Sequence, residues 1–181
     1  CFYNINLGEA RKSSEAGTAR ELSPNGSNLA AVLYELSKQS RTGQDRGLSA
    51  GFRDFLKASI PEFEGFRGKK RGKEERDLAT FEIRESKGWF SPRSVSDGTL
   101  KAMCFFLATL YGKDHAALVC FEEPENSVHP YLLGSMMQLV RDNPGVPQIL
   151  MATNSKTVAD AFQPENVFLV SKEKGDTLVR R

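Results

Sequence analysis

The feature that most constrains the fold is a short apolar run, residues 116–121, that ends abruptly in Glu122 and Glu123. The run contains Val and Phe and shows no alternation of polar and apolar side chains. Such a run is typical of a strand buried on both faces of a parallel sheet. The Pro124-Glu125 pair that follows stops any regular continuation. We therefore expect an α/β fold with this strand at its centre.

The two glutamates stand at the carboxyl end of the strand, where open α/β sheets bind their ligands. Successive side chains on a strand point to opposite faces, so Glu122 and Glu123 cannot both point the same way. One carboxylate can hold a metal ion while its neighbour faces a water molecule. This division suits hydrolysis of a nucleoside triphosphate, in which one acid holds Mg²⁺ and another orients the attacking water.

Helix and strand signals lie on either side of this run. Upstream, Ser96 or Asp97 can cap a helix, because the apolar residues that follow recur at the helical period. With Gly98 nearby, this helix start offers free N–H groups and the positive end of a dipole to an anion. Downstream, residues 130–141 predict a helix and residues 148–152 a second buried strand. A strand, helix and strand of these lengths predict a right-handed parallel crossover.

In this order the segments resemble the motifs of one family. The strand ending in Glu-Glu-Pro-Glu, followed by His129 and Pro130, resembles the Walker B motif and D-loop of ABC-type ATPases. Residues 94–100, SVSDGTL, resemble the signature motif, and residues 149–155, ILMATNS, resemble the switch strand and loop. The chain most resembles the bacterial predicted ATPases related to RecF and the chromosome-maintenance proteins, including the overcoming-lysogenization-defect ATPases. The stretch LSPNGSNLAAVLYEL extends this resemblance over most of the chain.

The resemblance implies the C-terminal lobe of a P-loop ABC-type ATPase, with a parallel β-sheet flanked by helices and an additional helical and hairpin region. It implies ATP and Mg²⁺ as cofactors, with Glu122 on the metal ion and Glu123 positioning or deprotonating the attacking water. It also implies a homodimer in the presence of ATP, driving DNA maintenance or anti-phage defence. In that head-to-tail dimer, the opposite protomer's γ-phosphate would be bound by the signature residues Ser96, Asp97, Gly98 and Thr99.

The switch loop departs from the family pattern. The resemblance implies that Thr153 binds the nucleotide and that the residue after it takes part in catalysis. Most members carry His there, which touches the γ-phosphate, whereas here Asn154 follows Thr153. An asparagine amide can donate a hydrogen bond to a phosphate but cannot take up a proton near neutral pH. An alternative function is therefore a nucleotide-gated dimerisation module with little or no hydrolysis. A third interpretation makes Glu122, Glu123 and Glu125 a two-metal nuclease site.

The glycine-rich Walker A loop, GxxxxGK[ST], does not occur in the sequence. In ABC-type ATPases this loop lies toward the N-terminus, and the chain does not begin with Met. We expect the C-terminal portion of one domain, inactive alone, with the Walker A lobe on the same or a separate chain. Residues 1–93 would form a helical and hairpin region, and residues 94–181 would hold the signature, Walker B, D-loop and switch.

A dense basic stretch lies between expected strands near residues 62–66 and 78–85. In the second of these strands Leu78, Thr80 and Glu82 alternate with Ala79, Phe81 and Ile83, which predicts a half-buried strand. The cations of the basic stretch can contact nucleic-acid phosphates, and the alternative is a solvated hairpin turn at Gly68 and Gly72. Four phenylalanines at and after an expected helix over residues 49–59 favour core packing over base stacking. The cations proposed for nucleic acid are Arg67, Lys69, Lys70, Arg71 and Lys73.

The composition is that of an ordinary globular protein, with 27% charged residues and a net charge of +2, so it neither demands nor excludes nucleic acid. We find no membrane-length segment and no signal-peptide layout, and therefore expect a cytoplasmic protein without a membrane partner. The three cysteines lack CxxC spacing and are expected to be reduced. His129 has no second histidine nearby, so we expect it to position a loop rather than bind a metal ion.

Overall fold

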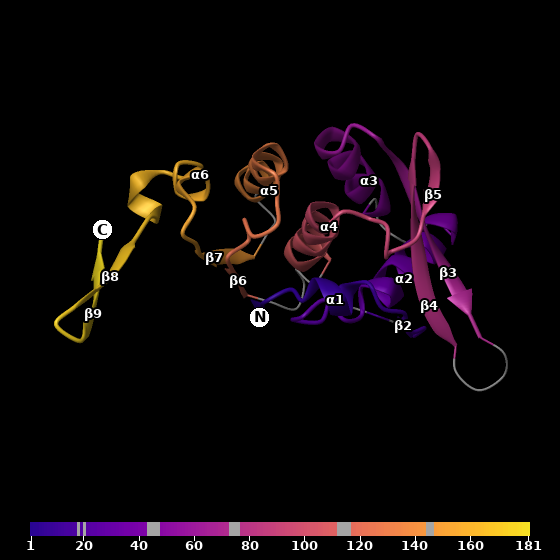
Figure 1. The fold of residues 1–181 in the computed structure, drawn as a ribbon, viewed down its shortest axis with the longest axis horizontal. Coiled ribbons are helices and arrows are strands. Elements are labelled where there is room, and N and C mark those ends of the chain that lie inside the picture. The colour runs from indigo at the N-terminus through magenta and orange to yellow at the C-terminus, as the bar shows by residue number, and fades with distance from the viewer. Residues whose placement is uncertain (18, 20, 43–47, 73–76, 112–116, 144–146) are drawn as a thin grey trace.

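A computed structural model describes residues 1–181 except 18, 20, 43–47, 73–76, 112–116 and 144–146. Figure 1 shows the helices α2 to α5 lying between an antiparallel sheet at one end and a parallel sheet near the middle. In chain order the elements are β1 (Phe2–Tyr3), α1 (Leu7–Ala10), β2 (Ser14–Glu15), α2 (Leu29–Thr42), α3 (Leu48–Ser59), β3 (Phe63–Arg71), β4 (Leu78–Glu85), β5 (Gly88–Phe90), α4 (Asp97–Leu110), β6 (Leu118–Glu122), α5 (Pro130–Asp142), β7 (Gln148–Ala152), α6 (Lys156–Ala159), a 3-10 turn (Pro164–Asn166), β8 (Leu169–Glu173) and β9 (Asp176–Arg180).

The parallel sheet has the strand order β1-β6-β7. β6 pairs in parallel with both neighbours, and α5 connects it to β7, so the expected parallel crossover is present. The expectation that β6 and β7 are buried on both faces is wrong in this structure. Leu118 of β6 is 40% exposed and Leu150 of β7 is 58% exposed. The reason is that the helices cover one face of a narrow sheet in which β7, within the described chain, pairs only with β6.

The antiparallel sheet has the order β2-β4-β3, with β5 paired to β4. In β4 the expected alternation is confirmed, because Ala79, Phe81 and Ile83 are buried. β3 is longer than expected and runs through Arg71, so most of the basic stretch is a strand rather than a loop. Gly68 serves close packing rather than a turn, since it lies against the backbone of Tyr34 in α2.

Helix α4 forms the centre of the core. Nearly all of its residues from Thr99 to Thr109 are buried, because α3 and α5 both pack against it. Aromatic rings join these layers: Phe52 lies 5.0 Å from Phe66 and 5.3 Å from Phe106, centroid to centroid. The phenylalanines of α3 and β3 therefore pack in the core, as expected, and do not form a base-stacking platform.

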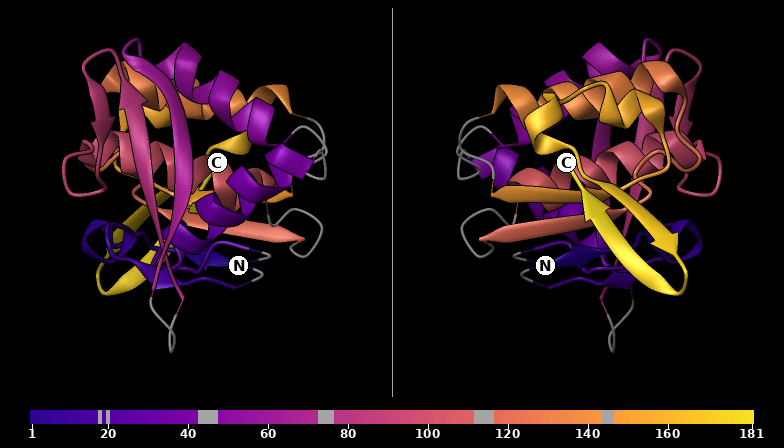
Figure 2. Two further views of the ribbon diagram at one scale, coloured as in Figure 1. Left: turned by 90° about the vertical axis from the view of Figure 1, so that its right-hand side faces the viewer. Right: turned by 90° about the vertical axis from the view of Figure 1, so that its left-hand side faces the viewer.

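The C-terminal hairpin β8–β9 lies at the far end of the molecule from β3 and β4 (Figures 1 and 2). Its apolar side chains are exposed, including Leu169, Val170 and Val179. Helix α6 is short and ends at Ala159, and Pro164 begins the 3-10 turn that follows.

All three cysteines are free, with Cys104 buried in α4. Burial raises the pKa of the Cys104 thiol to about 12, so this thiol is unreactive near neutral pH. Among the described helices, none combines the length and apolar character that crossing a bilayer requires.

Candidate functional site

The end of β6 presents two adjacent glutamates in different settings. Glu122 is the last residue of the strand and is exposed. Glu123 leaves the strand with a φ of 43°, and its N–H donates to the carbonyl oxygen of Ala152 at 2.8 Å. A left-handed conformation costs a residue with a side chain about 1–2 kcal/mol and persists where the surroundings fix it. The backbone thus turns Glu123 away from the direction of Glu122.

Two amide side chains hold the Glu123 carboxylate. Asn154 Nδ2 donates to Oε1 at 3.2 Å, and Asn126 Nδ2 donates to Oε2. An ionised carboxylate has about four lone-pair sites, so each oxygen can still accept a hydrogen bond from water. The switch residue Asn154 therefore reaches the expected catalytic base directly, which sequence analysis did not anticipate.

Glu125 ties the switch loop to the loop after β6. Its Oε1 accepts from Thr153 Oγ1 at 2.7 Å and from the Asn154 N–H at 3.0 Å. Thr153 Oγ1 also accepts from the Ser155 N–H at 2.9 Å. Glu125 Oε2 is buried with no hydrogen-bond partner in the described structure. The Thr153 hydroxyl, expected to contact nucleotide, is thus already engaged on both sides within the protein.

A pocket of about 350 Å³ opens beside these glutamates. Glu122, Glu123 and Asn126 line it together with Asn4, whose Nδ2 donates to Glu122 Oε2 at 3.0 Å. Carboxylate and amide oxygens are the ligands that Mg²⁺ prefers, and this ion is usually held by one or two carboxylates plus substrate phosphates. The residues present therefore fit Mg²⁺ bound together with a nucleotide.

A metal site made by the protein alone is a different case. In the described part of the chain, no three His, Cys, Asp or Glu side chains cluster closely enough to hold an ion. Glu125 faces the switch loop instead of joining Glu122 and Glu123, so the geometry lends no support to a two-metal nuclease. His129 caps α5, with Nδ1 accepting from the Tyr131 N–H at 3.3 Å, which agrees with a loop-positioning role.

The expected signature motif forms the start of α4. Ser96 is the N-cap residue, and its Oγ accepts from the Thr99 N–H at 3.1 Å while donating to Thr99 Oγ1 at 2.8 Å. A Cβ added to Gly98 would lie 3.1 Å from the carbonyl oxygen of Ser127. The glycine thus permits α4 to approach the loop after β6 closely, in addition to any role toward phosphate.

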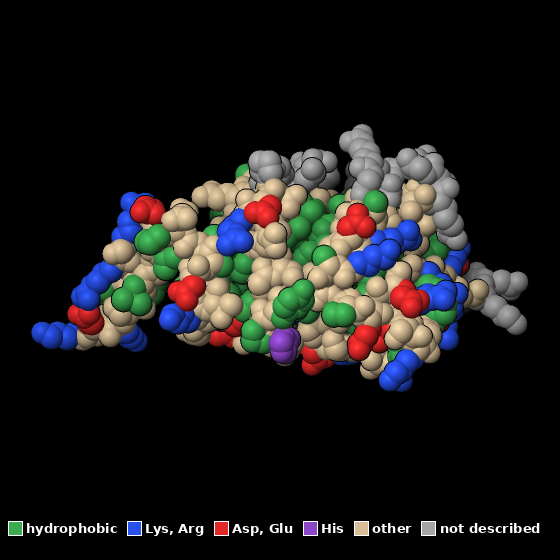
Figure 3. Space-filling view, turned by 90° about the horizontal axis from the view of Figure 1, so that it is seen from above, with side chains coloured by type: hydrophobic (Ala, Val, Ile, Leu, Met, Phe, Trp, Pro, Cys, Tyr) green, Lys and Arg blue, Asp and Glu red, His purple; other side chains and the backbone are tan. Residues whose placement is uncertain are grey.

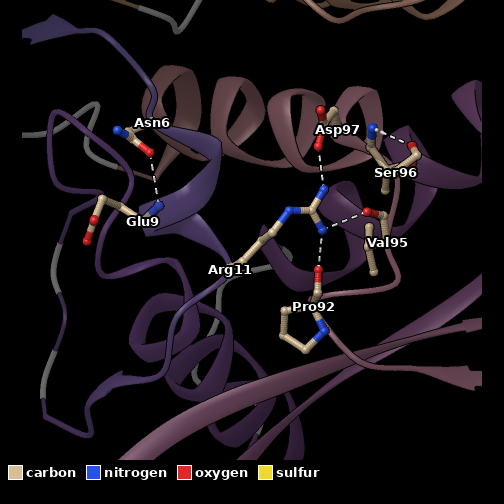
Figure 4. Close-up of polar contacts among 8 residues, drawn as sticks. Asn6, Glu9, Arg11, Pro92, Val95, Ser96 and Asp97 are labelled. Carbon is tan, nitrogen blue, oxygen red and sulfur yellow. Dashed lines mark hydrogen bonds and ion pairs between the residues drawn. The ribbon is translucent and has the colours of Figure 1, made fainter.

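Asp97 is bound from within the chain. Its carboxylate pairs with Arg11, whose guanidinium also donates to the carbonyl oxygens of Pro92 and Val95 (Figure 4). The Asp97 carboxylate is therefore paired with a cation of the protein itself. Ser96, Gly98 and Thr99, which carry no negative charge, are the signature residues better suited to bind an anion.

Lys101 links α4 to Glu123. Its Nζ donates to the Glu123 carbonyl oxygen at 3.3 Å, and the residue lines the same pocket. Burial lowers the pKa of Lys101, partly offset by Glu125 and Glu123. The structure thus adds Asn4, Lys101 and Asn126 to the site. Of these, Asn126 lies in the segment that resembles the D-loop, and that resemblance was the signal in the sequence.

The basic stretch is largely neutralised by β4. Arg67 and Lys69 both pair with Glu82 at 2.6 Å, and Lys70 pairs with Asp77 at 2.5 Å. Lys73 lies outside the described residues. On the face seen in Figure 3, Lys and Arg side chains lie among Asp and Glu side chains. Of the cations proposed for nucleic acid that the structure describes, Arg71 is therefore the one without an ion pair to a described residue.

The fold is shared with solved heads of SMC ATPases. A structure described as "Structural biochemistry of ATP-driven dimerization and DNA stimulated activation of SMC ATPases" aligns with a TM-score of 0.60 at 13% identity, over 79% of this chain and 88% of that chain. The SmcHead bound to the C-winged helix domain of ScpA aligns with a TM-score of 0.60 at 16% identity, over 84% and 48%. A Pyrococcus furiosus Smc head with an extended coiled coil gives 0.59 at 16% identity, over 81% and 38%.

The chain thus spans most of one SMC head chain and less than half of the other two. No curated protein matches the sequence. Residues 7–160 match the family model described as "AAA domain, putative AbiEii toxin, Type IV TA system". Because this match covers most of the chain, the protein belongs to that family of AAA-domain ATPases, and its fold is that of the SMC ATPase heads.

Proposed function

We propose that this chain supplies the Walker B, D-loop, signature and switch side of an ATP-hydrolysing site. The observation that carries the proposal is the setting of Glu123, which follows β6 and is held by Asn126 and Asn154 beside a pocket. A carboxylate fixed in this way can orient a water and accept its proton. Residues 94–181 carry these motifs, and residues 1–93 precede them.

Each acidic residue has its own task. Glu122, exposed and oriented by Asn4, holds Mg²⁺ directly or through water. When bound with ATP, this ion would neutralise negative charge on the β- and γ-phosphates. Glu123 positions the attacking water and accepts its proton, while Asn154 holds the carboxylate of Glu123 in place.

A second protomer completes the proposed site. Ser96, Gly98 and Thr99 lie at a helix start, where N–H groups and the helix dipole favour a phosphate. The same segment contacts the D-loop at Ser127. ATP bound between two copies would therefore affect both the signature and the D-loop. One of the solved SMC ATPase structures with this fold is described by the words "ATP-driven dimerization".

The proposed Walker A lobe would cover the exposed end of the molecule. Leu150 of β7 and the β8–β9 residues Leu169, Val170 and Val179 are between 58% and 64% exposed. Exposed apolar side chains on neighbouring elements favour contact with another protein surface. A lobe carrying the phosphate-binding loop, on the same or a separate polypeptide, is the partner that the site requires.

For the biological process we propose DNA maintenance or anti-phage defence in the cytoplasm. The family description names a toxin of a type IV toxin–antitoxin system, and one solved SMC structure is described by the words "DNA stimulated activation". Arg71, which carries no ion pair with the described residues, is the nucleic-acid contact that this proposal retains from β3.

The test uses the full-length protein with its Walker A lobe. Glu123→Gln should lower ATP turnover by about 100-fold or more, because general-base catalysis contributes on that scale, and ATP binding should persist. Glu165→Gln is the matched control, since this glutamate lies in the distant 3-10 turn. Turnover by Glu123→Gln within threefold of the unsubstituted protein would refute the assignment.

One observation favours the second candidate, a nucleotide-gated dimerisation module. Both oxygens of the Glu123 carboxylate already accept amide hydrogen bonds, and neither amide can exchange a proton. Asn154→His should raise single-turnover hydrolysis about tenfold if hydrolysis is merely weakened, a change of about 1.4 kcal/mol in barrier. ATP-dependent dimerisation without hydrolysis, in both the unsubstituted protein and the Asn154→His variant, would favour the dimerisation module instead.

A further inference from the structure

A second pocket, of about 760 Å³, includes Pro92 and Arg93, just before the signature segment, in its lining. It is formed where the loop after α1 meets β3, β4 and the residues before α4. It shares no lining residue with the pocket at Glu122 and Glu123. Among the described residues, Glu82 is the one acid in the lining, and five cations line the pocket with it: Arg11, Lys12, Lys69, Arg71 and Arg93.

The pocket keeps an excess of positive charge after its ion pairs are counted. Glu82 is shared by Lys69 and Arg67, and hydrogen bonds from these two residues hold the pKa of its carboxyl below the ordinary range. Lys12 pairs with Glu9 at 2.6 Å. Arg71 and Arg93 form no ion pair with the described residues. Two guanidinium groups therefore remain to meet a ligand.

Arg11 connects this pocket to the signature. Its side chain is 21% exposed, and its guanidinium donates to the carbonyl oxygens of Pro92 and Val95 and to the Asp97 carboxylate (Figure 4). Pro92 and Val95 lie in the segment that leads into α4, and Asp97 is the first residue of the helix. The conformation of that segment thus depends on a cation that also lines the pocket.

We propose that the pocket binds an anion that carries several phosphates, and that this anion competes with Asp97 for Arg11. Guanidinium groups bind phosphate through paired hydrogen bonds. The pocket volume falls within the range of small-molecule sites. A single carboxylate would satisfy one arginine only, whereas a chain of phosphates matches several cations on different walls.

Occupancy would change the signature as well as the pocket. Arg11 drawn toward the ligand releases the Asp97 carboxylate in the first turn of α4, where an acidic side chain interacts favourably with the helix dipole. The pocket therefore acts as a regulatory site for the start of α4, and it is separate from the pocket at Glu122 and Glu123.

The test is calorimetric titration of the chain with inorganic tripolyphosphate in EDTA, so that metal-dependent binding at Glu122 does not contribute. Arg71→Ala should weaken binding at least tenfold, because a charge-assisted hydrogen bond to phosphate is lost. Lys70→Ala is the matched control. Lys70 directly precedes Arg71 on β3 and has the same charge, but it pairs with Asp77 and does not line the pocket. This control should change affinity less than twofold.

Two further arms complete the design. Asp97→Asn should strengthen tripolyphosphate binding, because the competitor for Arg11 is weakened, and unchanged affinity would overturn the coupling. A single-stranded oligonucleotide that displaces tripolyphosphate would identify a nucleic-acid backbone as the source of the phosphates, and failure to displace it would identify a free polyphosphate. Equal weakening by Arg71→Ala and Lys70→Ala, or no saturable binding, would overturn the site.

Discussion

The contact between α2 and β3 at Gly68 makes the sharpest stability prediction. A Cβ added there would lie 2.3 Å from Tyr34 Cα, 2.8 Å from Tyr34 N and 2.9 Å from the Leu33 carbonyl oxygen. These are backbone atoms of a buried helix, so no side-chain rotation can relieve the clash. The Gly68 N–H also donates to Ser37 Oγ at 2.8 Å, and this bond fixes the strand against the helix.

The magnitude follows from the clash. Overpacking a core usually costs about 1–3 kcal/mol, and a backbone contact this short places Gly68→Ala at about 3 kcal/mol or more. Gly65, in the same strand, has nothing within 4 Å of an added Cβ. Gly65→Ala should therefore be neutral or stabilise by about 0.5–1 kcal/mol, the usual gain over glycine within a strand.

Urea unfolding of the 181-residue chain and both variants measures the difference. With a slope of about 2 kcal/mol per molar urea, Gly68→Ala should lower the unfolding midpoint by about 1.5 M. If the free energies of unfolding of Gly68→Ala and Gly65→Ala agree within about 0.5 kcal/mol, the close packing of α2 on β3 is incorrect. The placement of Lys69 and Arg71 in the basic pocket would then lose its support.

Three other predictions concern the site. Folding lowers the pKa of Lys101, so its charged form destabilises the folded state at pH 7, and this cost disappears as pH rises to the ordinary lysine pKa. Lys101→Met should therefore raise the urea midpoint at pH 7, with a smaller difference at pH 10. The same variant should slow ATP turnover. Gly98→Ala should change the free energy of unfolding by less than about 1 kcal/mol, because the added Cβ would lie 3.1 Å from the Ser127 carbonyl oxygen and a small shift relieves that contact, yet it should lower ATP-dependent dimerisation measured by light scattering. Asn126→Ala removes one amide from Glu123 and should reduce turnover about tenfold, equivalent to one hydrogen bond of about 1.4 kcal/mol; unchanged turnover would contradict the proposed setting of Glu123.

The parts of the fold predicted from sequence are those with local signals. The start of α4 was predicted because a cap residue, a glycine and an apolar helical period all lie within a few turns. The alternation in β4 predicted its buried face for the same reason. Both patterns depend on neighbours in sequence, so each segment alone suffices to find them.

The basic stretch was misinterpreted because glycine has two uses. Gly68 and Gly72 were assigned to a turn, but Gly68 sits within β3 where only a hydrogen atom fits against α2. Composition also cannot show that Glu82 lies across from Arg67 and Lys69. That register is set by pairing two strands, and it decides which cations remain free.

The site residues that sequence analysis missed act across long stretches of chain. Asn4 reaches Glu122 across 118 positions, and Arg11 reaches Asp97 across 86. Short strand β1 sets the first contact by pairing with β6. A lone asparagine or arginine carries no pattern of its own, so only tertiary structure can assign its partner.

These long-range contacts converge on the first turn of α4. Asp97 and Lys101 are four residues apart, which places them one above the other on the same side of the helix. Asp97 is held by Arg11 from the basic pocket, and Lys101 reaches the Glu123 carbonyl oxygen in the other pocket. Because a helix turn is rigid, a ligand that draws Arg11 away from Asp97 changes the forces on the residue that steadies Glu123. One turn of α4 therefore gives phosphate binding at one pocket a direct physical route to the proposed catalytic glutamate at the other.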